Sequence, residues 1–272
     1  MSARSRQRLS GSSNQRCDQT ARQEVLKEIV NTLARIISVA LGLALLPIAS
    51  VVAAQFVVID STSPSYVAGT IIDDVKTLSI HANERITVVA EDGKTRTIEG
   101  PFEGVVDSDT GGIAGGKGLI RTISKLVAAD QSSSRIGAVR GGVAAPVPDD
   151  IFFVRVDYSG QVCLAGSAAM LWRPNAADPG ILLIREIGGE NRKTELNWPA
   201  GARQLAWPQE LQPQEAMSYL LRFRDSTRRA TRVNVAFVDR AAPTTAHQIA
   251  ILAEKQCLEQ AGQLLKELVG EQ

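Results

Sequence analysis

The stretch "ERITVVAEDGKTRTIEG", residues 84–100, sets the fold class because it has the pattern of two strands joined by a tight turn. Each half is rich in Val, Ile and Thr, the β-branched residues that suit a half-buried, pleated strand. Asp92-Gly93 lies between the halves, and glycine readily adopts the positive φ that a two-residue hairpin turn needs. The stretch therefore predicts a β-hairpin in which Lys94 and Thr95 begin the return strand.

The same turn resembles the end of a phosphate-binding P-loop, since residues 93–95 read "GKT". A P-loop needs a further glycine five residues earlier, and Val88 stands there. A second stretch, "GGIAGGKG" at 111–118, keeps the glycine spacing but has Gly118 where the magnesium-binding hydroxyl belongs. The sequence therefore predicts no nucleotide cofactor, and both lysines are interpreted as solvated turn or linker residues.

Similar short runs surround the hairpin, among them "QFVVID", "GTIID" and "KTLSI", each bounded by turn residues. Over residues 55–104 this β-rich module resembles the FecR type of periplasmic domain. The matching positions are Gly69, Leu78, Ile86 to Val89, Asp92-Gly93 and Ile98. The resemblance implies a non-enzymatic module that senses, binds or scaffolds. The chain lacks the sigma-factor-binding helices recognisable in the iron-citrate regulator of that family, which puts signalling through a sigma factor in doubt.

Residues 1–54 carry an export pattern. Residues 1–35 contain seven basic and three acidic side chains, and an uncharged run follows, "IISVALGLALLPIASVVAAQ". A basic region, an apolar region with Pro47 and small residues before Gln55 together resemble a secretory signal peptide. The alternative is an uncleaved signal anchor, because residues 36–54 are just long enough to span a bilayer. We expect a periplasmic protein that begins near Gln55, or else an inner-membrane protein with a periplasmic C-terminal part.

Export determines how the three cysteines are interpreted. Cys17 lies ahead of the apolar run, so Cys163 and Cys257 are the only pair in the exported part. An even number of cysteines in an oxidising compartment predicts a disulfide, and two unrelated buried thiols are the alternative. With two histidines and no Cys-x-x-Cys motif, no transition-metal site is expected.

Residues 105–149 have the composition of a Gly-rich linker around a short amphipathic helix, "LIRTISKLVAA". Its predicted apolar face comprises Leu119, Ile120, Ile123, Leu126 and Val127. This helix either docks onto a domain or binds a partner. Arg135 and Arg140 follow in a predicted loop, where they contact an anionic polymer or are simply solvated.

Residues 150–272 contain eight strand-like runs at roughly ten-residue spacing, which is typical of an immunoglobulin-like β-sandwich. Trp172, Trp198 and Trp207 each come just before a proline, and they form either a carbohydrate-binding surface or a seal on the core. A terminal helix follows, capped by Thr244 or Thr245. Its apolar stripe includes Cys257, so the predicted disulfide joins helix and sheet.

The whole chain is expected to be mainly β. Its composition, 44% hydrophobic and 22% charged with a net charge of +1, is that of an ordinary globular protein. No nucleophile motif or metal cluster is present, although Asp73, Asp74, Glu91 and Asp92 are conceivable acids and bases. We expect a non-enzymatic envelope binding or scaffolding protein whose partner is a protein or polymer and not a nucleic acid. The alternatives are a membrane-anchored FecR-like regulator, a polysaccharide-binding protein and a hydrolase.

Overall fold

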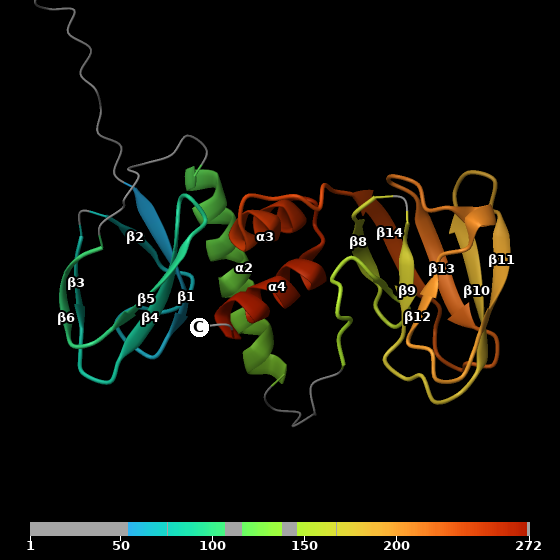
Figure 1. Cartoon of the computed structure of the whole chain (residues 1–272), viewed down its shortest axis with the longest axis horizontal. Helices are drawn as coiled ribbons and strands as arrows, with labels where there is room; N and C mark the ends of the chain where they lie inside the picture. The colour runs from blue at the N-terminus through green and yellow to red at the C-terminus, as the bar shows by residue number, and fades with distance from the viewer. Residues whose placement is uncertain (1–53, 75, 107–115, 138–145, 167, 271–272) are drawn as a thin grey trace, which may run out of the picture. The chain divides into compact units, whose positions relative to one another are not determined.

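A computed structural model describes residues 54–74, 76–106, 116–137, 146–166 and 168–270, and the side chains of 132–137 are outside this description. Residues 52–272 form one compact unit. The expected signal segment, residues 36–54, lies outside the described residues except for Ala54. The unit is mainly β, as predicted, with one helix after the first sheet and two helices at its C-terminal end (Figure 1).

The N-terminal part contains two antiparallel sheets. One has the strand order β2-β1-β4-β5, and the other is the pair β3-β6. Their bounds are β1 (Gln55–Ser61), β2 (Ile71–Asp73), β3 (Thr77–Ile80), β4 (Arg85–Ala90), β5 (Thr95–Glu99) and β6 (Phe102–Val105). Apolar side chains from both sheets, including Phe56, Leu78 and Ile86, pack into one core cluster.

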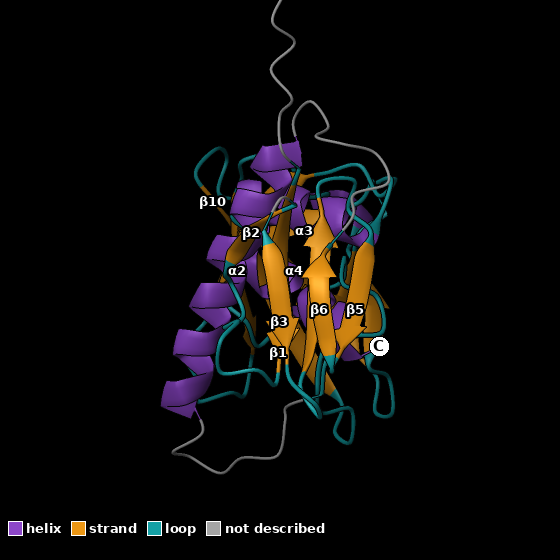
Figure 2. Cartoon of the chain, turned by 90° about the vertical axis from the view of Figure 1, so that its left-hand side faces the viewer, coloured by secondary structure: helices purple, strands orange, loops and turns teal. Residues whose placement is uncertain are grey.

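Strands β1 and β4 are buried on both faces, whereas the sequence predicts half-buried strands. Phe56 and Val58 face the β3-β6 pair, while Val57 and Ile59 pack against the helices. Burial on both faces explains why "FVVI" is a continuous apolar run and why "ITVV" contains a single polar residue, Thr87, which is itself buried. Figure 2 shows α3 and α4 behind the strands of this sheet.

The predicted hairpin is present as β4 and β5, paired from Arg85–Glu99 to Val89–Thr95. Gly93 has the expected positive φ of 78°. The connection, however, spans the four residues 91–94, and the backbone N–H of Gly93 donates to the carbonyl of Ala90 at 2.9 Å. Thr95 begins the return strand, while Lys94 stays in the turn, where its ammonium pairs with Asp92 at 3.2 Å.

Helix α2 (Gly116–Gly137) is twice as long as the predicted run of eleven residues and has 22 residues. Its predicted apolar face is confirmed, because all five residues are buried in the cluster that the helices share with β1 and β4. Ser124 Oγ also donates to the carbonyl oxygen of Gly69 at 2.6 Å. The helix is therefore packed into the core of the unit.

The C-terminal strands form a five-stranded sheet, β11-β10-β13-β14-β8, and a three-stranded sheet, β12-β9-β7. Both are mixed, because β8 runs parallel to β14 and β7 runs parallel to β9. Side chains from both sheets share one hydrophobic core. These two sheets together are called the sandwich below. The strand bounds are β7 (Val154–Arg155), β8 (Gly160–Leu164), β9 (Met170–Trp172), β10 (Gly180–Ile187), β11 (Lys193–Trp198), β12 (Gln204–Ala206), β13 (Ser218–Phe223) and β14 (Thr231–Phe237). A short 3-10 helix, η2 (Gln209–Leu211), lies between β12 and β13.

The expected single terminal helix is two helices, α3 (Thr245–Glu254) and α4 (Leu258–Gly270). Thr244 caps α3 by accepting a bond from the backbone N–H of His247 at 3.3 Å. The break falls where Gln256 has a φ of 64°, a left-handed conformation that ends a helix. The apolar stripe continues across the break, which is why the sequence pattern alone does not reveal it.

The predicted disulfide is confirmed between Cys163 on β8 and Cys257 in the break between α3 and α4, with 5.8 Å between the Cα atoms. Beside it, the side-chain amide of Gln260 accepts from the Cys163 N–H at 2.7 Å and donates to the Cys163 carbonyl at 2.8 Å. The same amide nitrogen donates to the carbonyl of Ile151 at 2.6 Å. A covalent bond and a buried polar contact thus join the helices to the sandwich.

Candidate anion-binding pocket

The three tryptophans of the predicted binding surface lie inside the sandwich. Trp172, Trp198 and Trp207 are 2%, 1% and 3% exposed. The indole N–H of Trp198 donates to the carbonyl of Ala202 at 2.9 Å, which satisfies its polar edge in the interior. The rings therefore seal the core, which was the alternative interpretation, and in this structure they present no exposed platform to a sugar.

The two predicted binding arginines are not brought into a site by the described residues. Arg135 lies within the last turns of α2 and not in a loop, because the helix continues to Gly137. Its side chain, and the whole of Arg140, are outside the described residues. Contact of these two arginines with an anionic polymer stays a prediction.

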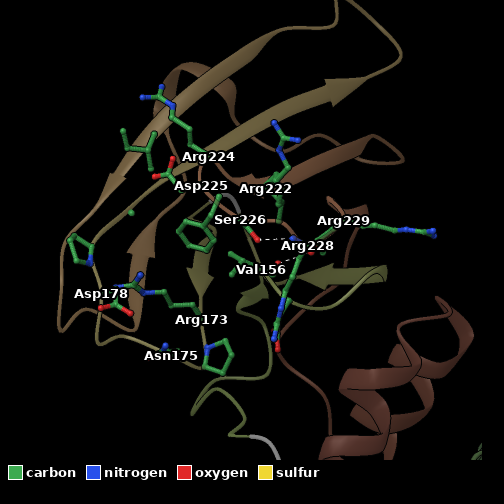
Figure 3. A pocket seen from close by; sticks show the side chains of 18 residues that line it. Val156, Arg173, Asn175, Asp178, Arg222, Arg224, Asp225, Ser226, Arg228 and Arg229 are labelled. Atoms are coloured by element: carbon green, nitrogen blue, oxygen red, sulfur yellow. Dashed lines mark hydrogen bonds between the residues drawn. The ribbon is translucent and has the colours of Figure 1, made fainter.

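A different group of arginines surrounds a pocket at one end of the sandwich. The pocket has a volume of about 560 Å³ and lies between the segment after β9, the start of β10 and the connection from β13 to β14. Five arginines and three aspartates are among its lining residues, which gives them a net charge of +2. The charged lining residues are Arg173, Arg222, Arg224, Arg228, Arg229, Asp157, Asp178 and Asp225 (Figure 3).

Arg173 is the buried cation of this pocket, with 6% of its surface exposed. Its Nε donates to the carbonyl of Ala202 at 3.0 Å, and its Nη2 donates to the carbonyls of Ala176 at 3.3 Å and Pro199 at 2.9 Å. The guanidinium carbon lies 5.1 Å from the ring centroid of Trp198. These contacts fix the guanidinium plane in one orientation, held by the loop that follows β11.

The bonds of Arg173 to neighbouring carbonyls leave part of its donor capacity unused. An arginine has five N–H donors, and the three bonds above use those of Nε and Nη2. Within the part of the chain that the structure describes, Nη1 has no hydrogen-bond partner and the guanidinium forms no ion pair. Figure 3 shows the side chain extending toward Asp178 at one side of the pocket.

Burial disfavours the positive charge of Arg173. Desolvation lowers its pKa, and the negative charge of Asp178 offsets only part of this effect. An oxoanion bound beside the guanidinium would restore the lost stabilisation, since charge-assisted bonds from arginine to carboxylate, phosphate or sulfate are the stronger class of hydrogen bond. The arrangement is therefore suited to holding an anionic group.

The outer lining of the pocket comes from the turn between β13 and β14. The backbone N–H of Arg228 donates to Ser226 Oγ at 3.1 Å, and both Arg228 and Arg229 are exposed. Figure 3 shows Arg229 extending away from the pocket. In this conformation its charge attracts an approaching anion but does not contact an anion inside the pocket. Arg224 is paired with Glu195.

The sequence contains a signal for this site that is separate from the binding residues predicted above. The stretch "RFRDSTRRATR", residues 222–232, has five arginines in eleven residues at a strand connection. Such a cluster indicates an anion-binding surface. Arg173 itself has no such signal, because its burial depends on the folded position of a loop distant in sequence.

Among the residues the structure describes, no three His, Cys, Asp or Glu side chains are grouped as a metal site requires. No described helix is long and apolar enough to cross a membrane. No model of a known protein family matches the chain, and no curated protein and no solved structure matches it either.

Proposed function

We propose that this chain is a non-enzymatic binding protein of the bacterial cell envelope, exported to the periplasm, which holds an anionic group of its ligand in the arginine-lined pocket. The observation that carries the proposal is Arg173, a buried cation that lines the pocket and whose guanidinium is held by three bonds to backbone carbonyls through Nε and Nη2. Burying a charge without an ion pair is costly, and a bound anion would offset that cost.

The compartment is supported by two independent features. The disulfide between Cys163 and Cys257 is of a kind that persists in oxidising compartments. The basic and apolar pattern of residues 1–54 is typical of an export signal. We also propose that residues 55–104 form a FecR-like module and that the two C-terminal sheets form an immunoglobulin-like sandwich.

Titration calorimetry of the full chain with inorganic phosphate, sulfate and acetate tests the pocket. We expect binding of at least one anion, and Arg173→Met should weaken it by about 10- to 100-fold, since a hydrogen bond to a charged group contributes about 1.5–3 kcal/mol. Arg121→Met, on the exposed side of α2, is the matched control and should leave binding unchanged.

Because Arg173 also holds neighbouring carbonyl groups, its replacement alters the pocket wall as well as the charge. Arg228→Ala provides a second variant, since this exposed side chain lines the pocket and makes no described ion pair. It should weaken anion binding while leaving the thermal midpoint unchanged. Wild-type protein that binds none of the three anions, or variants that bind as tightly as wild type, would contradict the proposed pocket.

A further inference from the structure

A second basic surface begins at the edge of the pocket and extends over the face of the five-stranded sheet that is turned away from the sandwich core. Strand alternation separates this outer face from the inner residues Leu182, Ile184, Tyr219 and Leu221, which are all buried. Its members are Ile181, Leu183 and Arg185 on β10, Lys193, Glu195 and Asn197 on β11, Leu220, Arg222 and Arg224 at β13, and Arg232 on β14.

The helices cover this outer face only at the side of the sheet formed by β14 and β8. Cys163 and Ala236, paired on β8 and β14, are buried in the cluster shared with the helices. On β10, β11 and β13, by contrast, Arg185, Lys193 and Arg222 are exposed. The same face thus packs against helices at one end and is open to solvent at the other.

The positions of the cations on the open part of the face lower the stability of the sheet. Arg185 and Lys193 are directly opposite each other on β10 and β11, a position in which like charges destabilise a sheet. In the described part of the chain neither forms an ion pair, and neither does Arg222 or Arg232. The face has five cations and one carboxylate, Glu195, which is paired with Arg224.

Aliphatic side chains lie among these cations. Leu183 is flanked in register by Glu195 and Arg222, and Leu220 lies between Arg185 and Arg232. Both leucines are half-buried. A ligand that complements this pattern has carboxylates for the cations and aliphatic groups for the leucines, which a polypeptide offers and a polysaccharide, polar along its length, does not.

We propose that the open part of this outer face docks an acidic segment of a partner protein that carries aliphatic residues among its carboxylates. The surface is distinct from the anion pocket, since Arg185, Lys193 and Arg232 are not among the pocket's lining residues. Ile181, Arg222 and Arg224 belong to both. The two sites can therefore be tested separately with residues that belong to only one of them.

Fluorescence anisotropy with the full chain and a labelled peptide of repeated Glu-Glu-Leu tests the docking surface. We expect salt-sensitive binding that Lys193→Glu weakens by about tenfold or more, because a rim cation is replaced by a charge that repels the peptide. The change also replaces the like-charge pair with an attractive one, so the variant should be at least as stable as wild type. Arg121→Glu is the control with the same charge change on α2.

Competition identifies the class of ligand. Unlabelled Glu-Glu-Leu peptide should compete better than polyglutamate of equal charge, and the difference should shrink in Leu183→Thr. Absence of peptide binding, unchanged binding by Lys193→Glu, or stronger competition by a heparin oligosaccharide or phosphatidylglycerol vesicles would overturn the proposal. Lys193→Glu should keep the anion binding of the pocket, and Arg173→Met should keep peptide binding, so failure at one site is distinguishable from failure at the other.

Discussion

The N-terminal sheet and the C-terminal sandwich pack against the same helices, but different kinds of contact attach them. On the sheet side, Val57, Ile59 and Val89 contribute apolar surface, and the turn at Gly93 fits closely against the start of α3. On the sandwich side, a disulfide and the buried amide of Gln260 make the connection.

The sandwich side also has an ion-pair network, which reaches α4. Arg155 pairs with Glu259 on α4 at 2.7 Å and with Asp157 at 3.0 Å, and its guanidinium lies over the ring of Trp172. The difference teaches that a redox-dependent bond and polar contacts add to apolar packing on the sandwich side. On the sheet side, apolar packing and steric fit are the main contacts.

Loss of the disulfide should have the largest effect. Cys163→Ser and Cys257→Ser should each lower the free energy of unfolding by about 3–5 kcal/mol, because the bond restricts a long loop of the unfolded chain with a sequence separation of 94. The double variant should be no worse than either single one, since both remove the same crosslink. Denaturant unfolding with and without reductant checks this: reductant should destabilise wild type only.

The steric fit on the sheet side is broken most directly by Gly93→Val. A Cβ at this position would lie 2.6 Å from Nδ1 of His247, and the backbone has positive φ. We expect a loss of roughly 2–4 kcal/mol, from left-handed backbone strain combined with overpacking. Lys94→Ala, one residue on and exposed at the same turn, should change stability by less than about 0.5 kcal/mol. Equal stability of the two variants would show that the turn does not pack against α3.

On the sandwich side, Gln260→Leu separates the polar contact from the covalent one. It leaves the N–H and carbonyl of Cys163 and the carbonyl of Ile151 without their partner, while the disulfide stays intact. An unsatisfied buried group costs about 1–3 kcal/mol, and we expect a loss in that range. Thermal unfolding compared with Gln204→Leu, at an exposed position of β12, measures it. No loss beyond the control would mean that water replaces the amide.

The smallest effect concerns pH at the Gly93 turn. Burial raises the pKa of Asp92, but hydrogen bonds from the backbone N–H and ammonium of Lys94 outweigh it, and the pKa of the carboxyl is lowered in the folded protein. Asp92 therefore stabilises the fold above its ordinary pKa, and this contribution is lost as pH falls through the lower folded value. Asp92→Asn should show a shallower loss of stability below about pH 4 than wild type. Parallel curves for the two proteins would contradict this role.

Much of the local structure could be predicted from the sequence because it depends on neighbouring residues. The strand runs, the positive φ of Gly93, the apolar face of α2 and the Thr244 cap all follow from local patterns. The disulfide followed from the cysteine count and the inferred compartment.

The features that were missed depend on tertiary packing. Burial of β1 on both faces requires the helices to return to the sheet, and burial of the three tryptophans depends on which loops cover them. Arg173 is buried because carbonyls of residues 199–202, distant in sequence, surround its guanidinium. No pattern of spacing identifies such a contact in advance.

Intact-mass spectrometry of the protein recovered from periplasmic extracts, alkylated without reduction, tests most directly whether the sandwich is bonded to the helices in an exported chain. We predict a chain that begins near Gln55, carries no alkyl group on Cys163 or Cys257, and takes up two after reduction. A full-length chain in the membrane fraction would favour the anchor instead. Two alkylated thiols without reduction would contradict the account, because the helices would then be held to the sandwich by packing and polar contacts alone.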